Sequence, residues 1–139
     1  MDDAPAMGIG RAAERTGLSV HTLRFYEKEG LLPWPVRRDP AGRRAYGATD
    51  LEWFAVCSSL RASGMPLPRI RRYAELVRAG EGTEAERLEL LRAHRDDVRA
   101  RIAELEGALS LIEYKVGFYA DRIADGTAAR VWTGQPTEE

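Results

Sequence analysis

The sequence predicts a mainly α-helical protein: an N-terminal winged helix-turn-helix domain with a small β-hairpin wing, followed by a long C-terminal antiparallel coiled-coil dimerisation helix. Three observations predict this class. Two short helical segments flank a glycine turn, a basic segment rich in Pro and Gly follows them, and a seven-residue apolar repeat fills the C-terminal part. We expect residues 8–79 to form the first domain, residues 83–124 the dimerisation helix, and residues 125–139 a short tail.

The helix-turn-helix is predicted by local signals. Residues 8–15 carry apolar side chains at helical spacing. Gly17 suits the left-handed conformation of a turn, and Ser19 is a favourable N-cap for a second helix over residues 20–28. Gly30 is a stop signal for that helix.

One face of the second helix is basic and aromatic. His21, Arg24, Phe25 and Lys28 follow the i, i+3, i+4, i+7 spacing of an outer face. Arg24 can bond guanine edges or clamp a phosphate, His21 can reach a base edge, and Phe25 can pack on sugar or a thymine methyl. Tyr26 can donate a hydrogen bond to a phosphate. This face predicts DNA binding; the alternative is that Phe25 and Tyr26 are core residues and the charges are merely solvated.

Residues 33–47 read as a small basic hairpin. The turn chemistry of residues 39–42 separates two short extended pieces. Basic pairs flank this turn on both sides: Arg37, Arg38, Arg43 and Arg44. A basic hairpin beside a helix-turn-helix is a wing.

Two more helices follow the wing. Thr49 and Glu52 form a capping box that begins a helix running to about Ser63. Pro66 opens another helix, since proline is tolerated in a first turn, and this helix continues to about Ala79.

A heptad repeat begins after Thr83. Ten of eleven a and d positions are apolar or aromatic over five heptads, with Arg95 the exception. The residues predicted to pair two copies are Leu91, Val98, Ile102, Leu105, Leu109, Ile112, Val116 and Tyr119. The alternative, a lone amphipathic helix packed on a globular body, is disfavoured because a helix of about 40 residues reaches roughly 60 Å.

The charges beside the seam indicate the direction of pairing. The e positions are Arg92, Arg99, Glu106 and Glu113. In an antiparallel pair the arginines face the partner's glutamates, with the two-fold axis between Ala103 and Glu104. A parallel pair gives one favourable contact and one unfavourable contact. Each exposed ion pair contributes little, so the preference for the antiparallel pair comes from the set.

Composition sets further limits. The formal net charge is −1, but residues 1–79 hold 13 Lys/Arg and 9 Asp/Glu, whereas residues 80–139 hold 8 and 13. A basic N-terminal part fits a polyanionic partner, although a chance separation of the charges is an alternative.

A single cysteine excludes an intramolecular disulfide framework. The chain carries no long apolar run and no signal-peptide pattern, so we expect a cytoplasmic protein with no membrane partner. It also has no Gly-rich phosphate loop and no nucleophile–base pair, so we expect no enzyme.

The motifs together resemble one family. The segment TLRFYEKEGLL over residues 22–32 is similar to the TLRYYE-x-x-GLL signature of MerR transcription regulators, and residues 42–46 resemble that family's G-x-R-x-Y wing motif. The family's two following helices are matched by Asp50, Leu51, Leu60, residues 64–67 and Ile70. Two departures stand out: Phe25 replaces a more usual tyrosine, and Arg43 stands where an aromatic residue is common.

The resemblance implies a mechanism. Dimers of this family occupy promoters whose two polymerase-recognition elements are too far apart, and they bend and untwist the duplex so that RNA polymerase can use it. The start of the helix after Met65 would form a second wing against phosphate, with its free N–H groups turned to the anion. The residues expected to contact DNA are Ser19, His21, Thr22, Arg24, Phe25, Tyr26, Lys28, Arg37, Arg43, Arg44, Tyr46 and Arg69.

Effector binding is the part that the sequence determines least. Three aromatic residues are candidates for a small pocket shared between subunits: Tyr114, Phe118 and Trp132. The alternative is that Trp132 pins the tail. His21 and His94 form no ligand cluster, so we expect no metal and no cofactor. Cys57 is expected to be a buried, inert thiol rather than a thiol sensor, and Trp53 to meet the partner subunit or the coil.

Three functions remain open. The first is a dimeric, promoter-bending transcription regulator, with or without a small-molecule effector. The second is an effector-independent architectural DNA-bending protein, similar to an excisionase. The third is a coiled-coil adaptor with no nucleic-acid role.

Overall fold

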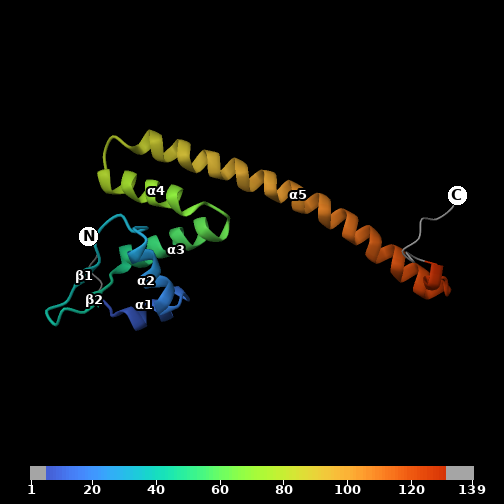
Figure 1. Cartoon of the computed structure of the whole chain (residues 1–139), viewed down its shortest axis with the longest axis horizontal. Coiled ribbons are helices and arrows are strands. Elements are labelled where there is room, and N and C mark those ends of the chain that lie inside the picture. Colours follow the sequence, from blue (N-terminus) through green and yellow to red (C-terminus); the bar gives the residue numbers. More distant parts are fainter. Residues whose placement is uncertain (1–5, 131–139) are drawn as a thin grey trace. The chain divides into compact units, whose positions relative to one another are not determined.

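The computed structural model describes residues 6–130. Its elements, in chain order (Figure 1), are α1 Ile9–Thr16, α2 Val20–Lys28, β1 Arg37–Arg38, β2 Arg44–Ala45, α3 Ala48–Ala62, α4 Leu67–Ala79, α5 Glu84–Asp125 and a 3-10 turn, η1, at Ala128–Arg130. The helices, the two-stranded hairpin and the long C-terminal helix confirm the predicted fold class. The antiparallel pairing of two copies of α5 stays a prediction.

The chain divides into two compact units after Asp96. The first holds α1 to α4, the hairpin and the first turns of α5, so it extends past the end expected at residue 79. The reason is that Leu90 packs against the core, and the Nε2 atom of His94 lies 2.8 Å from the Ser63 hydroxyl oxygen at the end of α3. The second unit holds the rest of α5 and η1.

The turn between α1 and α2 follows the sequence signals. Gly17 has φ 74°, in the left-handed region, and its N–H donates to the Ala13 carbonyl at 2.9 Å. The Ser19 hydroxyl accepts the Thr22 N–H at 3.0 Å and caps α2. Helix α1 contacts both α2 and α3, so it helps to hold α2 in place.

The hairpin has a tightly bonded tip. Arg37 pairs with Ala45 and Arg38 with Arg44 in antiparallel register. The Asp39 carboxylate accepts the N–H groups of Arg43 and Ala41, each at 2.9 Å, and the bond from Arg43 is the main cause that lowers the pKa of Asp39. The turn therefore holds the arginines at fixed positions.

Helix α3 begins earlier than expected. Gly47 is its N-cap, and the Asp50 carboxylate accepts the Gly47 N–H at 2.8 Å. The same carboxylate accepts the indole N–H of Trp34 at 3.0 Å. The predicted capping box of Thr49 and Glu52 is wrong, because Asp50 stands at the third helical position and its carboxylate accepts the N–H of the N-cap residue, Gly47.

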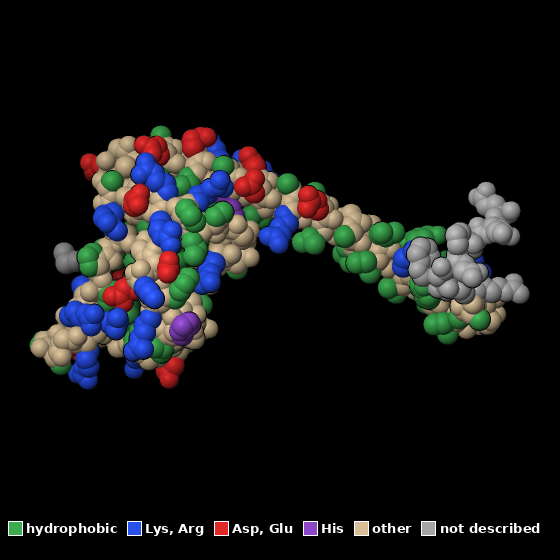
Figure 2. Space-filling model, in the orientation of Figure 1, with side chains coloured by type: hydrophobic (Ala, Val, Ile, Leu, Met, Phe, Trp, Pro, Cys, Tyr) green, Lys and Arg blue, Asp and Glu red, His purple; other side chains and the backbone are tan. Residues whose placement is uncertain are grey.

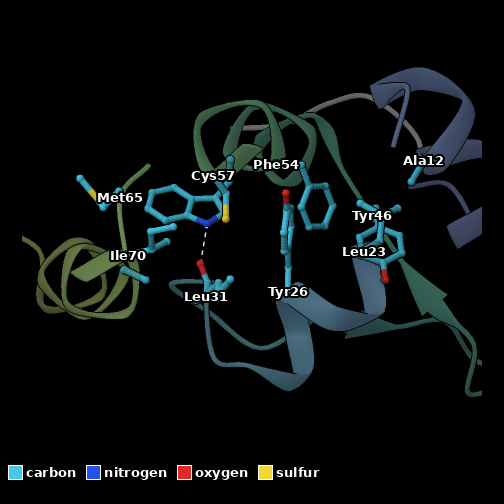
Figure 3. Packing of buried hydrophobic residues seen from close by; sticks show 11 residues of the cluster. Ala12, Leu23, Tyr26, Leu31, Tyr46, Phe54, Cys57, Met65 and Ile70 are labelled. Carbon is cyan, nitrogen blue, oxygen red and sulfur yellow. Dashed lines mark hydrogen bonds between the residues drawn. The ribbon is translucent and has the colours of Figure 1, made fainter. Parts of the chain in front are cut away.

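The core of the first unit lies where α2, α3 and α4 meet (Figure 3). Phe54 lies between the rings of Tyr26 and Tyr46, with centroids 6.2 and 5.6 Å away. Trp53 is 8% exposed, stacks on Tyr73 of α4 at 5.4 Å, and donates its indole N–H to the Leu31 carbonyl at 2.8 Å. The expectation that Trp53 meets the partner subunit is therefore wrong, since its apolar surface is already buried inside its own domain.

Candidate nucleic-acid interface and dimerisation surface

Helix α2 presents three exposed polar side chains on one arc: His21, Arg24 and Lys28. Leu23 is buried on the opposite side. In the described part of the chain, Arg24 and Lys28 pair with no carboxylate. Two uncompensated cations beside a histidine give this arc the charge and the hydrogen-bond donors that a major groove requires.

Ser19 and Thr22 lie at the start of the same helix. Their hydroxyl oxygens are 2.9 Å apart, and Ser19 remains exposed while Thr22 is half-buried. The two hydroxyls satisfy each other and the helix terminus. Direct contacts from either residue to DNA stay a prediction.

Tyr26 is 2% exposed, so its expected hydrogen bond to phosphate is wrong for this structure. Its hydroxyl points from α2 toward α3, beside Phe54 (Figure 3). The reason is spacing: Tyr26 follows Leu23 by three residues and shares its inner face. The alternative, in which Tyr26 is a core residue, is confirmed, and Phe25 is half-buried against the same core.

Tyr46 is fully buried, and the contact to the DNA backbone expected of it is likewise wrong here. No hydrogen-bond partner exists for its hydroxyl among the described residues. Burial is the main cause that raises the pKa of Tyr46, with the Glu27 carboxylate adding to the effect. Met7 anchors its backbone from the other side, with a bond of 2.8 Å from the Met7 N–H to the Tyr46 carbonyl.

Arg44 joins the wing to α2. Its Nε donates to the Glu27 carboxylate at 2.7 Å, and that hydrogen bond is the main cause that raises the pKa of Arg44. Both side chains are 28% exposed. A phosphate would compete with Glu27 for this guanidinium, so Arg44 positions the wing on α2 before any DNA contact forms.

The other wing arginines are more exposed. Arg43 lies 3.3 Å from Asp39 with its side chain 80% exposed, and Arg37 lies 3.9 Å from Asp50 with its side chain 65% exposed. Pairs this exposed contribute little to stability, so both guanidinium groups remain available to a phosphate. Figure 2 shows Lys and Arg side chains gathered over the hairpin and the neighbouring helices.

Helix α4 contributes Arg69, which is exposed in its first turn after Pro66. The position agrees with the expected second wing, and its contact with phosphate stays a prediction. Two further arginines of this helix bond the segment that follows α2, a role that their sequence positions did not predict. Arg71 bonds the Glu29 carboxylate at 2.7 Å, and Arg78 donates to the Pro33 carbonyl at 2.5 Å.

Arg71 and Arg78 clamp the segment that follows α2. They lie seven residues apart on α4 and therefore on the same face of the helix. This i, i+7 spacing is the sequence signal that could have identified them. By fixing this segment to α4, they set the position of α2 relative to the wing.

The second half of α5 exposes a continuous apolar stripe. Apart from the half-buried Leu91 and Val98, all the predicted seam residues are exposed, from Tyr119 at 39% to Val116 at 63%. Figure 2 shows hydrophobic side chains along this part of the helix. Apolar side chains in such numbers on one helix face are typical of an interaction surface.

The candidate effector residues are only partly placed. Tyr114 stacks on Phe118 with centroids 6.4 Å apart, and Arg122 lies 4.9 Å from the Phe118 centroid. Tyr114 is 66% exposed, so the described residues of its own chain do not enclose it. Trp132 lies outside the described residues.

Metal ligands do not gather in the described part of the chain: no three His, Cys, Asp or Glu side chains there stand close enough to hold an ion. His94 is buried against Ser63. Separately, within the residues that the structure describes, no helix has the length and apolar character needed to cross a membrane.

Cys57 is fully buried, as predicted. Burial raises the pKa of its thiol from 9.0 to about 11, against a smaller opposing effect of the Arg61 guanidinium. At pH 8 about one thiol in a thousand is ionised, and the thiolate is the reactive form.

We therefore expect Cys57 to resist iodoacetamide at pH 8 in the folded protein and to react fully in guanidinium chloride. The chain has one cysteine, so mass spectrometry counts this site alone. The raised pKa also means that the thiol's contribution to stability is complete below pH 9 and is lost as the pH rises through about 11. Equal labelling rates in the folded and unfolded protein would show that the thiol is accessible.

The sequence of this chain is similar to those of known proteins. The family model described as MerR HTH family regulatory protein matches residues 7–76, and a second, described as MerR, DNA binding, matches residues 51–112. An uncharacterized HTH-type transcriptional regulator of Haemophilus influenzae is 44% identical over 121 residues, which cover 87% of this chain and 89% of the relative. The mercuric resistance operon regulatory protein of Serratia marcescens is 37% identical over 99 residues, 70% of this chain and 65% of the relative.

One solved structure is similar over nearly its whole length. It is HiNmlR, described as a MerR family regulator lacking the sensor domain and bound to promoter DNA. It is 42% identical with a TM-score of 0.81, and the match covers 91% of this chain and 99% of that chain. The present chain belongs to the MerR family of helix-turn-helix transcription regulators.

Proposed function

We propose that the protein is a homodimer that binds two half-sites in promoter DNA, bends and untwists the duplex, and thereby controls transcription by RNA polymerase. The observation that carries this proposal is the exposed arc of His21, Arg24 and Lys28 beside a basic wing. The apolar stripe of α5 supports the dimer, because residues 6–130 of a single chain leave it exposed. Two symmetric heads match the two-fold symmetry of a palindromic site.

A second form of the proposal concerns regulation. HiNmlR is described as lacking a sensor domain, and the match covers 99% of that chain. Tyr114 and Phe118 lie on an open helix surface. These observations favour a protein that bends DNA without a small-molecule effector over one that carries a dedicated ligand domain.

The test begins with a pool of random duplex DNA. Duplexes retained by the purified full chain are amplified and sequenced, and we expect a near-palindromic motif. Circularly permuted fragments that carry this motif should then migrate at rates that depend on its position, because a bend near the middle slows a fragment most. No enriched motif would overturn sequence-specific binding, and equal mobilities would overturn bending.

Regulation is tested in transcription with purified RNA polymerase on a promoter that carries the selected motif. We expect the protein alone to change transcript yield. The same reaction is repeated with the small-molecule fraction of a cell extract. If the transcript yield changes only when this fraction is present, an effector is required and the proposal of effector-independent regulation is wrong.

A further inference from the structure

A guanidinium group from α3 lies on the ring of Phe25 at the border of the exposed arc of α2. The Arg61 Cζ atom is 4.6 Å from the ring centroid. Phe25 directly follows Arg24 and precedes Lys28 by three residues, so the ring borders the side chains expected in the groove. A cation at this distance from an aromatic face is attracted to it and loses much of its freedom.

The charge of Arg61 is not neutralised by a carboxylate in the described part of the chain. Three of the four wing arginines differ, since Arg37, Arg43 and Arg44 each have an acidic neighbour. Arg61 is also exposed. It is thus a fixed, solvent-facing and unpaired cation, which is the state suited to a phosphate.

Arg61 is the single Lys or Arg of α3. It therefore brings a positive charge to the edge of α2 from a different helix, 36 residues further along the chain. Phe25 stands where the family more commonly has a tyrosine, and its ring has no hydroxyl to offer to DNA. The guanidinium supplies a polar group at the place where the phenylalanine lacks one.

We propose that Arg61 contacts a DNA phosphate beside the groove that α2 enters, and that Phe25 acts as its positioning residue. This inference rests on the proposed DNA binding. A planar guanidinium can stack on the ring and still direct N–H groups to a phosphate oxygen. The pair works as one unit, so a change in either residue affects the same contact.

The test measures how DNA affinity depends on salt. Arg61→Met keeps a long side chain that packs on the Phe25 ring but removes the charge. Its dimer should lose about two phosphate contacts, so the slope of log K against log salt becomes shallower by about 2. Affinity at low salt should fall at least about tenfold. The probe is the duplex selected from the random pool.

Arg72→Met is the matched control. Arg72 is an exposed arginine of α4 that pairs with Glu75 and Glu86, so its replacement should leave the slope unchanged. An unchanged slope in Arg61→Met, with wild-type melting temperature, would overturn the proposed contact. A wild-type protein that binds no duplex at all would instead overturn the proposed function.

A double-mutant cycle tests the role of Phe25. Phe25→Leu should lower the DNA affinity severalfold in the wild-type background. It should change the affinity little in the Arg61→Met background, because the aromatic ring then has no guanidinium left to position. Equal effects in the two backgrounds would show that Phe25 acts independently of Arg61.

Discussion

Leu105→Asp should convert the dimer into a monomer of 15.5 kDa. Leu105 is 62% exposed in the single chain and lies beside the predicted two-fold axis, where it would face the partner's Ile102. The substitution places two carboxylates per dimer in the apolar seam. Each costs several kcal/mol to bury unpaired, so the dimer should weaken by at least about a thousandfold. Sedimentation equilibrium measures the mass directly.

Leu111→Asp provides the matched control. Leu111 lies on the same helix and is also 62% exposed, but it stands outside the heptad seam. We expect this variant to remain dimeric with unchanged helix content. If Leu105→Asp keeps the wild-type mass, or if both variants dissociate equally, the seam is assigned to the wrong face.

Arg24→Ala should strongly reduce sequence-specific DNA binding while the dimer and its melting temperature remain unchanged. Arg24 is exposed and bonds no other described residue, so its loss removes no internal contact. A bidentate contact to guanine contributes about 1–3 kcal/mol of discrimination, and the dimer loses two, so preference for the selected duplex should fall by roughly 30-fold or more. Competition between the selected duplex and a scrambled duplex measures this preference.

The control for Arg24→Ala is Arg72→Ala, which removes an exposed arginine of α4 that pairs with Glu75 and Glu86. Discrimination should stay at the wild-type level in that variant. A lower melting temperature in Arg24→Ala would show that the side chain supports the fold. Undiminished discrimination would remove Arg24 from the set of base-reading residues.

Local signals predicted most of the helices and turns. The cap at Ser19 and the left-handed turn at Gly17 depend on neighbours a few residues away, and both are present in the structure. The end of α5, expected near residue 124, lies at Asp125. Such features can be predicted because they depend on interactions between residues that are close in the sequence.

The burial of particular aromatic side chains was not predictable in the same way. Helical spacing puts Tyr26 on the inner face of α2 with Leu23, but only the packing of α3 on α2 shows that its ring contacts Phe54. Trp53 is buried because Tyr73 and the Leu31 carbonyl, from two other segments, receive its ring and its N–H. These outcomes depend on tertiary contacts that override local pattern.

Only the part of the binding surface that lies within one helix was predictable, because the rest depends on tertiary contacts. The outer arc of α2 follows from periodicity within one helix. The cation of Arg61 could not be assigned to that surface, because helical spacing gave only its position on α3 and not the helix that α3 would meet. The buried hydroxyl of Tyr46 likewise depends on how β2 packs against α3.

The antiparallel dimer is tested most directly by distances between spin labels, measured by pulsed electron paramagnetic resonance. Cysteines replace Glu104 or Asp121, both exposed on α5, in a Cys57→Ala background. With the two-fold axis between residues 103 and 104, the labels at 104 should lie within about 25 Å of each other. The labels at 121 should lie roughly 50 Å apart, since 35 residues of helix separate their levels. Short distances at both positions would mean a parallel pair and would contradict the dimer described here.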